Sequence, residues 1–303
     1  MNFFESPTRV LGLALGAGAV LGTAVAVSRY AYDGGASGIV VATIRTIIMT
    51  VTMAVGLKLL NISLKMPREM VVVSIVNGAL MAIMTYGNVG AVEFISVGLA
   101  SLLFFTFPII IAVFVVILGI EEVRPAKMAT VIVAFVGLAV MLGSSIGNVD
   151  IRGTLFALTA ALTTAISSIV VMKYFRQVNV FVATLHFSLW GFVVLAAIAL
   201  TIGDVRFPVT ASGWAGTIGV GVLQTIGTPM YLYAIARIGA LKVGMATNVQ
   251  PVVAIAEAWL WFGEVLTLAQ ALGGLLVLAA VGAMQWLDFR RQAGATKGAE
   301  AGR

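Results

Sequence analysis

Residues 234–264 read AIARIGALKVGMATNVQPVVAIAEAWLWFGE and decide the fold. A short basic turn opens this stretch, and an apolar helix follows with Pro251 in its interior. Residues 91–121, AVEFISVGLASLLFFTFPIIIAVFVVILGIE, have the same pattern. When they are shifted by 143 positions, Pro108 falls on Pro251, and both copies end on a glutamate. A pattern that recurs at one offset indicates weak internal symmetry and a duplicated chain.

The composition excludes a soluble globular protein. Of the 303 residues, 61% are hydrophobic and only 10% are charged, whereas soluble domains carry roughly 25% charged residues. The apolar runs are long and continuous rather than alternating, so they predict transmembrane helices and not barrel strands. The sequence has no cysteine, which excludes disulfides and thiol chemistry.

The apolar runs predict ten transmembrane helices joined by short linkers, with no inserted water-soluble domain. They cover residues 10–28, 39–60, 70–87, 94–118, 126–143, 153–172, 180–202, 212–235, 243–262 and 267–287. The residues after the last run are small and polar, so we expect a disordered tail over 291–303.

The basic residues predict the orientation. With ten spans, 14 Lys and Arg residues fall on the side that holds both termini, and three fall on the other side, namely Arg29, Arg152 and Arg206. Because cytoplasmic loops carry the excess of Lys and Arg, we expect both termini in the cytoplasm. The net charge of +6 is explained by these loops, and we expect no nucleic-acid partner.

Five predicted helices precede the polar linker 144–152 and five follow it. Because five is odd, the two halves enter the membrane in opposite directions. We therefore expect an all-α polytopic membrane protein built as an inverted 5+5 repeat, with halves 1–147 and 148–290 before the tail 291–303. Such repeats place a substrate path near the membrane midplane, between the halves.

The chain resembles the drug/metabolite transporter superfamily, and within it the EamA-type family. The motifs that carry the resemblance are AVEFISVGLASLL from Ala91, Pro108 and GIEE from Gly119, and in the second half AIARIGALK from Ala234, Gln250-Pro251 and Gly263-Glu264. The segment GGAS at 34–37, followed by Arg45, also fits. Ile120 departs from the pattern, because the family has an adjacent Gly-Glu there. The resemblance implies a bacterial inner-membrane exporter of small metabolites.

Pro108 and Pro251 lie near the middle of the fourth and ninth predicted helices. A proline inside a helix removes one backbone hydrogen bond and kinks the helix. Two readings are open: a pair of hinges that expose carbonyl groups to a cavity, or two static kinks. We favour hinges, because both halves have the proline.

Glu257 is an intramembrane carboxylate six residues after Pro251, among apolar neighbours. Such a group costs at least ~2.5 kcal/mol by insertion scales and usually faces a partner or water. At helical spacing it shares a face with Gln250 and Trp261. It is a candidate for binding a substrate ammonium group or a coupling proton. It is equally a candidate for a structural carboxylate near the outer membrane boundary.

Two further residues are candidates for coupling or gating. Arg45 lies inside the second helix, where it can attract an anionic group, pair with Glu257 or snorkel to headgroups. His186 is the single histidine, and its titration near neutral pH allows proton coupling or a structural hydrogen bond.

Polar side chains in lipid either join helices or line a cavity. Those with wide hydrogen-bonding capacity, together with nearby aromatic and sulfur groups, are the candidates for substrate binding. They are Asn77, Met81, Gln224, Asn248, Gln250, Glu257, Trp190 and Tyr231.

No phosphate-binding Walker motif occurs, and one histidine without cysteine makes no credible zinc site, so we expect no cofactor and no metal. The sequence favours a secondary transporter and not an enzyme, with a zwitterionic amino acid as the first candidate substrate and protons as a candidate driving ion. Alternatives are a nucleoside, a sugar or an organic cation, a membrane-embedded lipid-modifying enzyme, or a structural membrane subunit.

Overall fold

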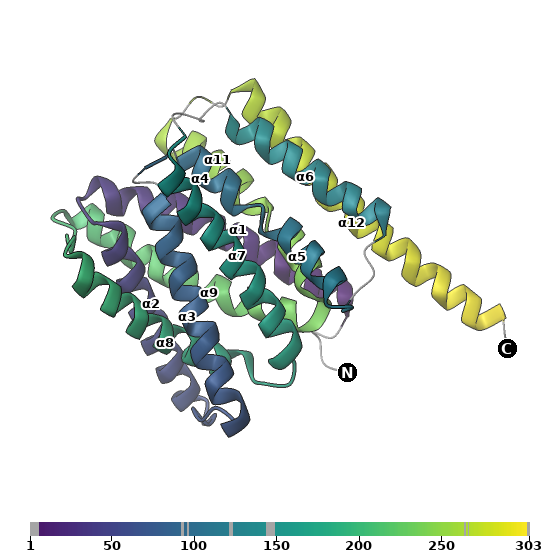
Figure 1. Ribbon diagram of the computed structural model, residues 1–303, viewed down its shortest axis with the longest axis horizontal. Coiled ribbons are helices and arrows are strands. Elements are labelled where there is room, and N and C mark those ends of the chain that lie inside the picture. Colours follow the sequence, from purple (N-terminus) through teal and green to yellow (C-terminus); the bar gives the residue numbers. More distant parts are fainter. Residues whose placement is uncertain are drawn as a thin grey trace.

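The computed structural model describes residues 6–91, 94–95, 97–120, 124–143, 149–263, 265 and 267–301, with backbone alone at 97–98, 285 and 288–301. All regular elements in these ranges are α-helices (Figure 1). They are α1 (Pro7–Asp33), α2 (Gly38–Leu59), α3 (Arg68–Ala91), α4 (Val97–Phe104), α5 (Phe107–Ile117), α6 (Pro125–Gly143), α7 (Ile151–Tyr174), α8 (Val180–Ile202), α9 (Ala211–Ile238), α10 (Ala240–Ala246), α11 (Val249–Phe262) and α12 (Leu268–Ala301).

The all-helical, multi-pass membrane fold is confirmed. Within the described ranges, eight helical segments are long and apolar enough to cross a membrane. These correspond to the first eight expected spans, with α4 and α5 together forming the fourth. The ninth expected span is divided into α10 and α11, and the tenth is the apolar stretch Leu268–Met284 of α12.

The helices begin and end at residues whose chemistry favours those positions. The side chains of Ser6, Asp150 and Thr210 accept hydrogen bonds from backbone N–H groups in the first turns of α1, α7 and α9. Each satisfies an N–H group that has no partner within its helix. Gly263 ends α11 in the left-handed conformation, which glycine adopts without steric cost.

The tail expected over 291–303 is described by its backbone alone, as far as Ala301. The backbone of α12 continues as helix to Ala301, past the start of the expected tail at residue 291 (Figure 1).

The main helix pairs are preserved when the two halves are exchanged. Helix α1 packs on α9, and its counterpart α7 packs on α3. Helix α9 also packs on α2, and α3 packs on α8. Two pairs join counterparts directly, α2 with α8 and α6 with α12, and Figure 1 shows these pairs at opposite edges of the molecule.

The helix formed by α4 and α5 and the helix formed by α10 and α11 are interrupted at equivalent positions. Helix α4 ends at Phe104 and α5 begins at Phe107, while α10 ends at Ala246 and α11 begins at Val249. Shifted by the same 143 positions, the first break falls within one residue of the second. The two interruptions therefore lie at similar positions in the two halves.

The break between α10 and α11 lies directly against two glycines of α1. A Cβ atom on Gly18 would lie 3.3 Å from the Thr247 Cα, and one on Gly22 would lie 2.6 Å from the Gln250 carbonyl oxygen. The corresponding residues of α7, at the 143 offset, are Ala161 and Ala165, both fully buried. Small residues on the first helix of each half thus allow the broken helix to approach closely.

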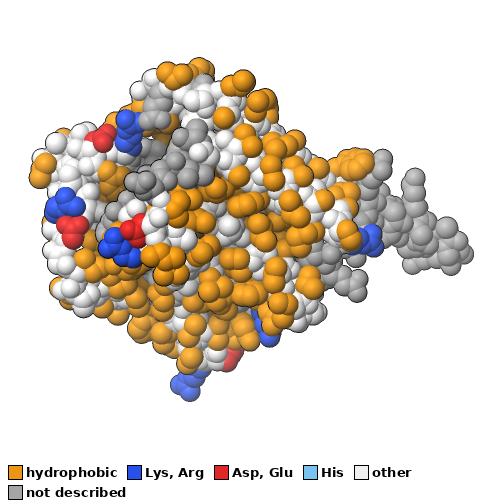
Figure 2. All heavy atoms as spheres, turned by 45° about the horizontal axis from the view of Figure 1, so that its top comes forward, with side chains coloured by type: hydrophobic (Ala, Val, Ile, Leu, Met, Phe, Trp, Pro, Cys, Tyr) orange, Lys and Arg blue, Asp and Glu red, His pale blue; other side chains and the backbone are white. Residues whose placement is uncertain are grey.

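The outer surface is apolar, as a lipid environment requires. Figure 2 shows one face covered largely by hydrophobic side chains, with Lys, Arg, Asp and Glu gathered toward its margins. Large aliphatic side chains such as Leu200, Leu260 and Leu275 are exposed on the surface of the protein. In water such a surface would aggregate, whereas in a bilayer it contacts acyl chains.

We expect Gly22→Ala to weaken the fold, because the new methyl group would overlap the Gln250 carbonyl oxygen. Overpacking of this kind costs about 1–3 kcal/mol. Thermal melting in detergent measures the effect. Gly12→Ala is the matched control, because a Cβ there meets nothing within 4 Å. Equal melting temperatures for the two variants would contradict the close contact between α1 and the break.

Candidate functional site

A small cavity of about 40 Å³ lies among α2, α3, α8 and α9. Its lining combines one cation, several hydroxyl groups, one amide and methionine side chains. The residues are Arg45, Thr46, Met49, Met81, Ala82, Met84, Thr85, Phe187, Ser188, Gly191, Leu195, Gln224 and Thr228. Among these described lining residues there is no carboxylate, so the cavity carries a net positive charge.

The cavity is lined by several residues at equivalent positions of the two halves. Three pairs of its lining residues are separated by the 143-residue offset: Arg45 and Ser188, Met81 and Gln224, and Thr85 and Thr228. The nearby glycines Gly78 and Gly221 form a fourth pair at the same offset. Gly78 lies against Phe187, Trp190 and Gly191 of α8, and Gly221 against Arg45 and Ile48 of α2.

Arg45 is the charged group of the cavity. Its Nη2 donates a hydrogen bond to the Thr85 hydroxyl at 2.8 Å. A guanidinium group has five N–H donors, and Thr85 is its hydrogen-bond partner within the described part of the chain. The group therefore retains the capacity to bind an anion that enters the cavity. Arg45 and Glu257 form no ion pair in the described ranges.

Glu257 lies outside the cavity, at the contact between α11 and α1. Its Oε1 accepts a hydrogen bond from the Thr23 hydroxyl at 2.7 Å. Its Oε2 is buried and has no hydrogen-bond partner among the described residues.

The two prolines follow short interruptions of their helices, at which Thr106, Thr247 and Asn248 keep right-handed helical dihedral angles, so the kinks suggested by the sequence stay a prediction. Pro108 is the second residue of α5, and Pro251 is the third residue of α11. A proline in the first turn costs little, because the N–H groups there have no partner within the helix. The prolines therefore mark the starts of the second half-helices.

Of the substrate-binding candidates, Met81 and Gln224 line the cavity, and the others do not. Tyr231 bonds to the Ser168 hydroxyl at 2.9 Å, between α9 and α7. Asn248 lies in the break before α11, where its Oδ1 has no partner in the described ranges. Gln250 follows at the start of α11, and its backbone N–H donates to the Thr247 carbonyl oxygen.

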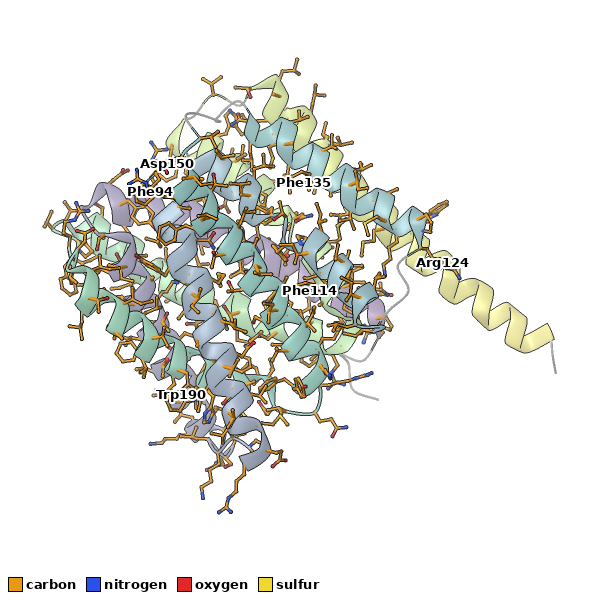
Figure 3. All side chains as sticks on the ribbon, viewed as in Figure 1. Phe94, Phe114, Arg124, Phe135, Asp150 and Trp190 are labelled. Carbon is orange, nitrogen blue, oxygen red and sulfur yellow. The ribbon has the colours of Figure 1, made fainter. Side chains whose placement is uncertain are left out.

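Asn77 lies on α3, and Trp190, which Figure 3 labels, lies on α8. Asn77 is fully buried, and neither its Nδ2 nor its Oδ1 has a partner among the described residues. The indole Nε1 of Trp190 is also buried and has no hydrogen-bond partner among the described residues. Both polar groups are therefore packed inside the protein and not in the cavity. A polar residue in a predicted transmembrane helix did not by itself indicate a cavity position.

His186 has a structural contact. Its Nε2 donates to the Leu64 carbonyl oxygen at 2.9 Å and so joins α8 to the connection between α2 and α3. His186, Arg45 and Glu257 therefore bond to three separate segments. Within the described ranges they do not assemble into the catalytic group that a lipid-modifying enzyme would need.

Four residues with a place in these sites were not predicted from sequence: Thr23, Thr85, Ser188 and Thr228. Single Ser and Thr residues are common in membrane helices and often bond to their own helix backbone. The 143-residue offset was the available signal, because it pairs Thr85 with Thr228 and Ser188 with Arg45.

A second hollow, a groove of about 330 Å³, lies on the surface between α3 and α7. Its lining is mostly apolar, with Arg152 beside Phe156 and Leu155. The Arg152 guanidinium donates two hydrogen bonds to Asp150, which hold the pKa of that carboxyl group below its usual value. Arg152 also lies 4.3 Å from the Phe94 ring, and Figure 3 shows Phe94 and Asp150 at the same end of the molecule.

The second half of the chain matches a known transporter family. Residues 151–284 match the model of the EamA-like transporter family. This range covers α7 to α11 and the apolar part of α12.

Three relatives carry transporter names. The chain is 26% identical over 198 residues to the uncharacterized transporter YdfC of Bacillus subtilis, over 64% of each chain. It is 25% identical over 234 residues to the uncharacterized transporter YoaV of the same organism, over 74% of this chain and 77% of the relative. An uncharacterized transporter of Archaeoglobus fulgidus is 24% identical over 194 residues, over 64% and 68% of the two chains. The match to the first of these spans just under two thirds of its length.

A solved crystal structure has the same fold, with a TM-score of 0.78 over 93% of this chain and 98% of that chain, at 18% identity. The resemblance to the EamA-type family within the drug/metabolite transporter superfamily is confirmed. Residues 151–284 match the EamA-like transporter family, and the chain is similar to membrane transporters of this type.

We expect Asn77→Leu to leave stability unchanged or to raise it. A buried amide without partners costs about 1–3 kcal/mol, and an apolar side chain of similar size removes this cost. Melting in detergent measures the change. Asn179→Ala is the comparison variant, because it removes the N-terminal cap of α8 and should lower stability by about 1 kcal/mol. A marked loss of stability in Asn77→Leu would indicate that the amide has a partner.

Proposed function

We propose that the protein is a secondary transporter that exports small zwitterionic metabolites, amino acids first, by alternating access. We further propose that it lies in a bacterial inner membrane with both termini in the cytoplasm, as the distribution of Lys and Arg predicts. The observation that carries the proposal is the cavity lined by equivalent positions of the two halves, with the Arg45 guanidinium as its charged group.

The packing supports two inverted five-helix halves. Exchange of the halves preserves the main helix pairs, the position of the helix breaks and three pairs of cavity residues. Inverted repeats bind substrate at the interface between the repeats and open it alternately to each side. A cavity formed by symmetry-related residues of α2, α3, α8 and α9 occupies such an interface.

The lining suits a carboxylate and an ammonium group at a short separation. Arg45 has donors for a carboxylate, with charge assistance. The Gln224 Oε1 accepts from Thr228 at 3.3 Å and has a second lone pair for an ammonium group. Thioether groups of Met49, Met81 and Met84 adapt to varied side chains.

The charge of the cavity argues against the alternatives. An organic cation would meet Arg45 and, among the described lining residues, no carboxylate. A neutral sugar or nucleoside would leave the partly buried guanidinium without an anionic partner, which is costly in a low-dielectric site. A substrate with a carboxylate compensates that charge.

The cavity volume supports a closed conformation. Ligand pockets measure about 300–1,000 Å³, whereas this cavity measures about 40 Å³. Binding therefore requires that helices around the cavity move apart. The breaks before Pro108 and Pro251 are the proposed hinges, because their half-helices can tilt without breaking a continuous set of helix hydrogen bonds.

The direct test of the function is efflux from proteoliposomes loaded with labelled amino acids or with the matching decarboxylated amines. The wild-type protein should release amino acids selectively. Arg45→Gln should raise KM for amino acids about 10- to 100-fold, because a hydrogen bond to a charged group contributes about 1.5–3 kcal/mol. Lys65→Gln, at an exposed residue between α2 and α3, is the matched control.

Equal loss of amino acids and amines from wild-type vesicles would contradict carboxylate recognition. Unchanged KM for amino acids in Arg45→Gln would remove Arg45 from the binding site. Retention of every amino acid by wild-type vesicles would overturn the proposed substrate class.

We expect Pro251→Ala to slow turnover while substrate binding is retained. Alanine restores an N–H group that can donate to the Thr247 carbonyl oxygen, so α10 and α11 can join into one stiffer helix. Pro108→Ala should act similarly at the other break. Rates of exchange across vesicles, with Pro67→Ala in an exposed connection as control, test this prediction. Wild-type turnover in both proline variants would refute the hinge.

A further inference from the structure

We infer that the surface groove between α3 and α7 binds a phospholipid whose zwitterionic headgroup carries a primary ammonium, as in phosphatidylethanolamine. One acyl chain lies along the apolar part of the groove, and the headgroup lies against Arg152 and Asp150. The groove is separate from the cavity among α2, α3, α8 and α9. The inference therefore does not depend on the proposed transport function or on its substrate.

The groove begins at the membrane boundary and extends into the hydrocarbon region. Its lining residues on α7 share one helix face and are Arg152, Leu155, Phe156 and Thr159. Arg152 is the second residue of a helix that is long and apolar enough to cross a membrane, so it lies at headgroup level. From Arg152 to Thr159 the helix axis advances about 10 Å. This length is roughly two thirds of one leaflet, because the hydrocarbon core is about 30 Å thick.

The apolar part of the groove suits an acyl chain. Helices α3 and α7 lie side by side (Figure 1), and α3 contributes Ile83, Tyr86 and Gly87 to the lining. A Cβ atom on Gly87 would lie 2.8 Å from the Phe156 carbonyl oxygen, so the two backbones touch there. The hollow beside this contact measures about 330 Å³, within the range of about 300–1,000 Å³ for ligand pockets. Because its lining is mostly apolar and faces the bilayer, it takes a hydrocarbon chain.

The charged end of the groove is held in place by several contacts. Nε and Nη2 of Arg152 donate to the two carboxylate oxygens of Asp150, at 3.1 Å and 2.8 Å. The guanidinium carbon lies 4.3 Å from the centre of the Phe94 ring. That ring stacks on the ring of Phe156, with 6.1 Å between the ring centres. Figure 3 shows Phe94 and Asp150 at the same end of the molecule. These contacts fix the guanidinium at the mouth of the groove, with 65% of the Arg152 side chain exposed to a ligand.

The ion pair is complementary to both charges of a zwitterionic headgroup. A guanidinium has five N–H donors, and Asp150 occupies two of them, so donors remain for a phosphate. Oδ2 of Asp150 accepts one hydrogen bond and has a further lone pair for an ammonium N–H. The hydrogen bonds from Arg152 hold the pKa of the Asp150 carboxyl group below its usual value, so the group is ionised at neutral pH.

The same ion pair disfavours the other common headgroups. An anionic headgroup would bring a negative charge to Asp150 without an ammonium to compensate it. A quaternary ammonium, as in phosphatidylcholine, has no N–H group to donate. A phosphate together with a primary ammonium satisfies both members of the pair.

The chain contains a matched ion pair without the groove. Arg206 donates to Asp204 through the same two nitrogen atoms, Nε at 2.8 Å and Nη2 at 3.2 Å. Its side chain is 69% exposed, close to the value for Arg152. Arg206 does not line the groove. Variants of the two arginines therefore separate the effect of the groove from the effect of an exposed ion pair.

Native mass spectrometry of the purified full chain in detergent measures the binding. Phosphatidylethanolamine, phosphatidylcholine and phosphatidylglycerol with identical acyl chains are added in turn. We expect phosphatidylethanolamine to bind about tenfold more tightly than the other two. Arg152→Gln should weaken its binding about tenfold, because the variant removes a hydrogen bond from a charged donor to the phosphate. Arg206→Gln should leave the binding unchanged.

Two further variants test the two ends of the groove. Asp150→Asn should shift the preference to phosphatidylglycerol, because the mouth of the groove then has a net positive charge, and asparagine still caps α7. Thr159→Trp, at an exposed position, should fill the groove and abolish binding. Thr52→Trp, at an exposed position of α2, is its matched control. Melting temperatures without added lipid show that each variant is folded.

Four results would overturn the inference. The first is equal binding of the three lipids by the wild-type protein, and the second is equal loss of binding in Arg152→Gln and Arg206→Gln. The third is retention of phosphatidylethanolamine by folded Thr159→Trp, since the lipid would then bind elsewhere. The fourth is binding of soluble glycerophosphoethanolamine as tightly as the lipid, because the apolar part of the groove would then contribute nothing.

Discussion

The fold depends on one constraint: backbone N–H and C=O groups in lipid need hydrogen-bond partners within the protein. Two predicted spans leave the regular helix locally, at the interruptions before Phe107 and Val249, where turn hydrogen bonds replace part of the helical pattern. Both breaks are therefore covered by packing. Helix α1 places glycines against the break between α10 and α11, and α7, with small residues at the equivalent positions, packs on α4 and α5. Irregular backbone is thus confined to the interior, where it is available for movement.

The same packing explains where the polar groups lie. Exchange of the halves relates α2, α3, α8 and α9 in pairs, so their shared interface contains side chains from equivalent positions. Equivalent positions are not identical residues: Arg45 corresponds to Ser188, and Met81 to Gln224. This difference makes a symmetric architecture chemically asymmetric, with a cation on one side of the cavity and an amide on the other. Two ends of a zwitterion require such a difference.

The sequence predicted the fold well, because hydrophobic run length and internal repetition are direct consequences of the bilayer. It located both helix interruptions through Pro108 and Pro251. The cavity was predicted only in part. Met81 and Gln224 line it, whereas Asn77 is buried in packed helices. One sequence does not specify the rotation of a helix about its axis, and that rotation separates cavity from core.

The central claim is that the cavity between the two halves opens alternately to the two sides of the membrane. Met81→Cys introduces a single cysteine into a chain that has no other. A membrane-impermeant thiol reagent, applied to either side of sealed vesicles, then measures how accessible the cavity is from that side. The account predicts labelling from both sides, with substrate changing the two rates in opposite directions. Labelling from one side alone, whatever the substrate concentration, would contradict it.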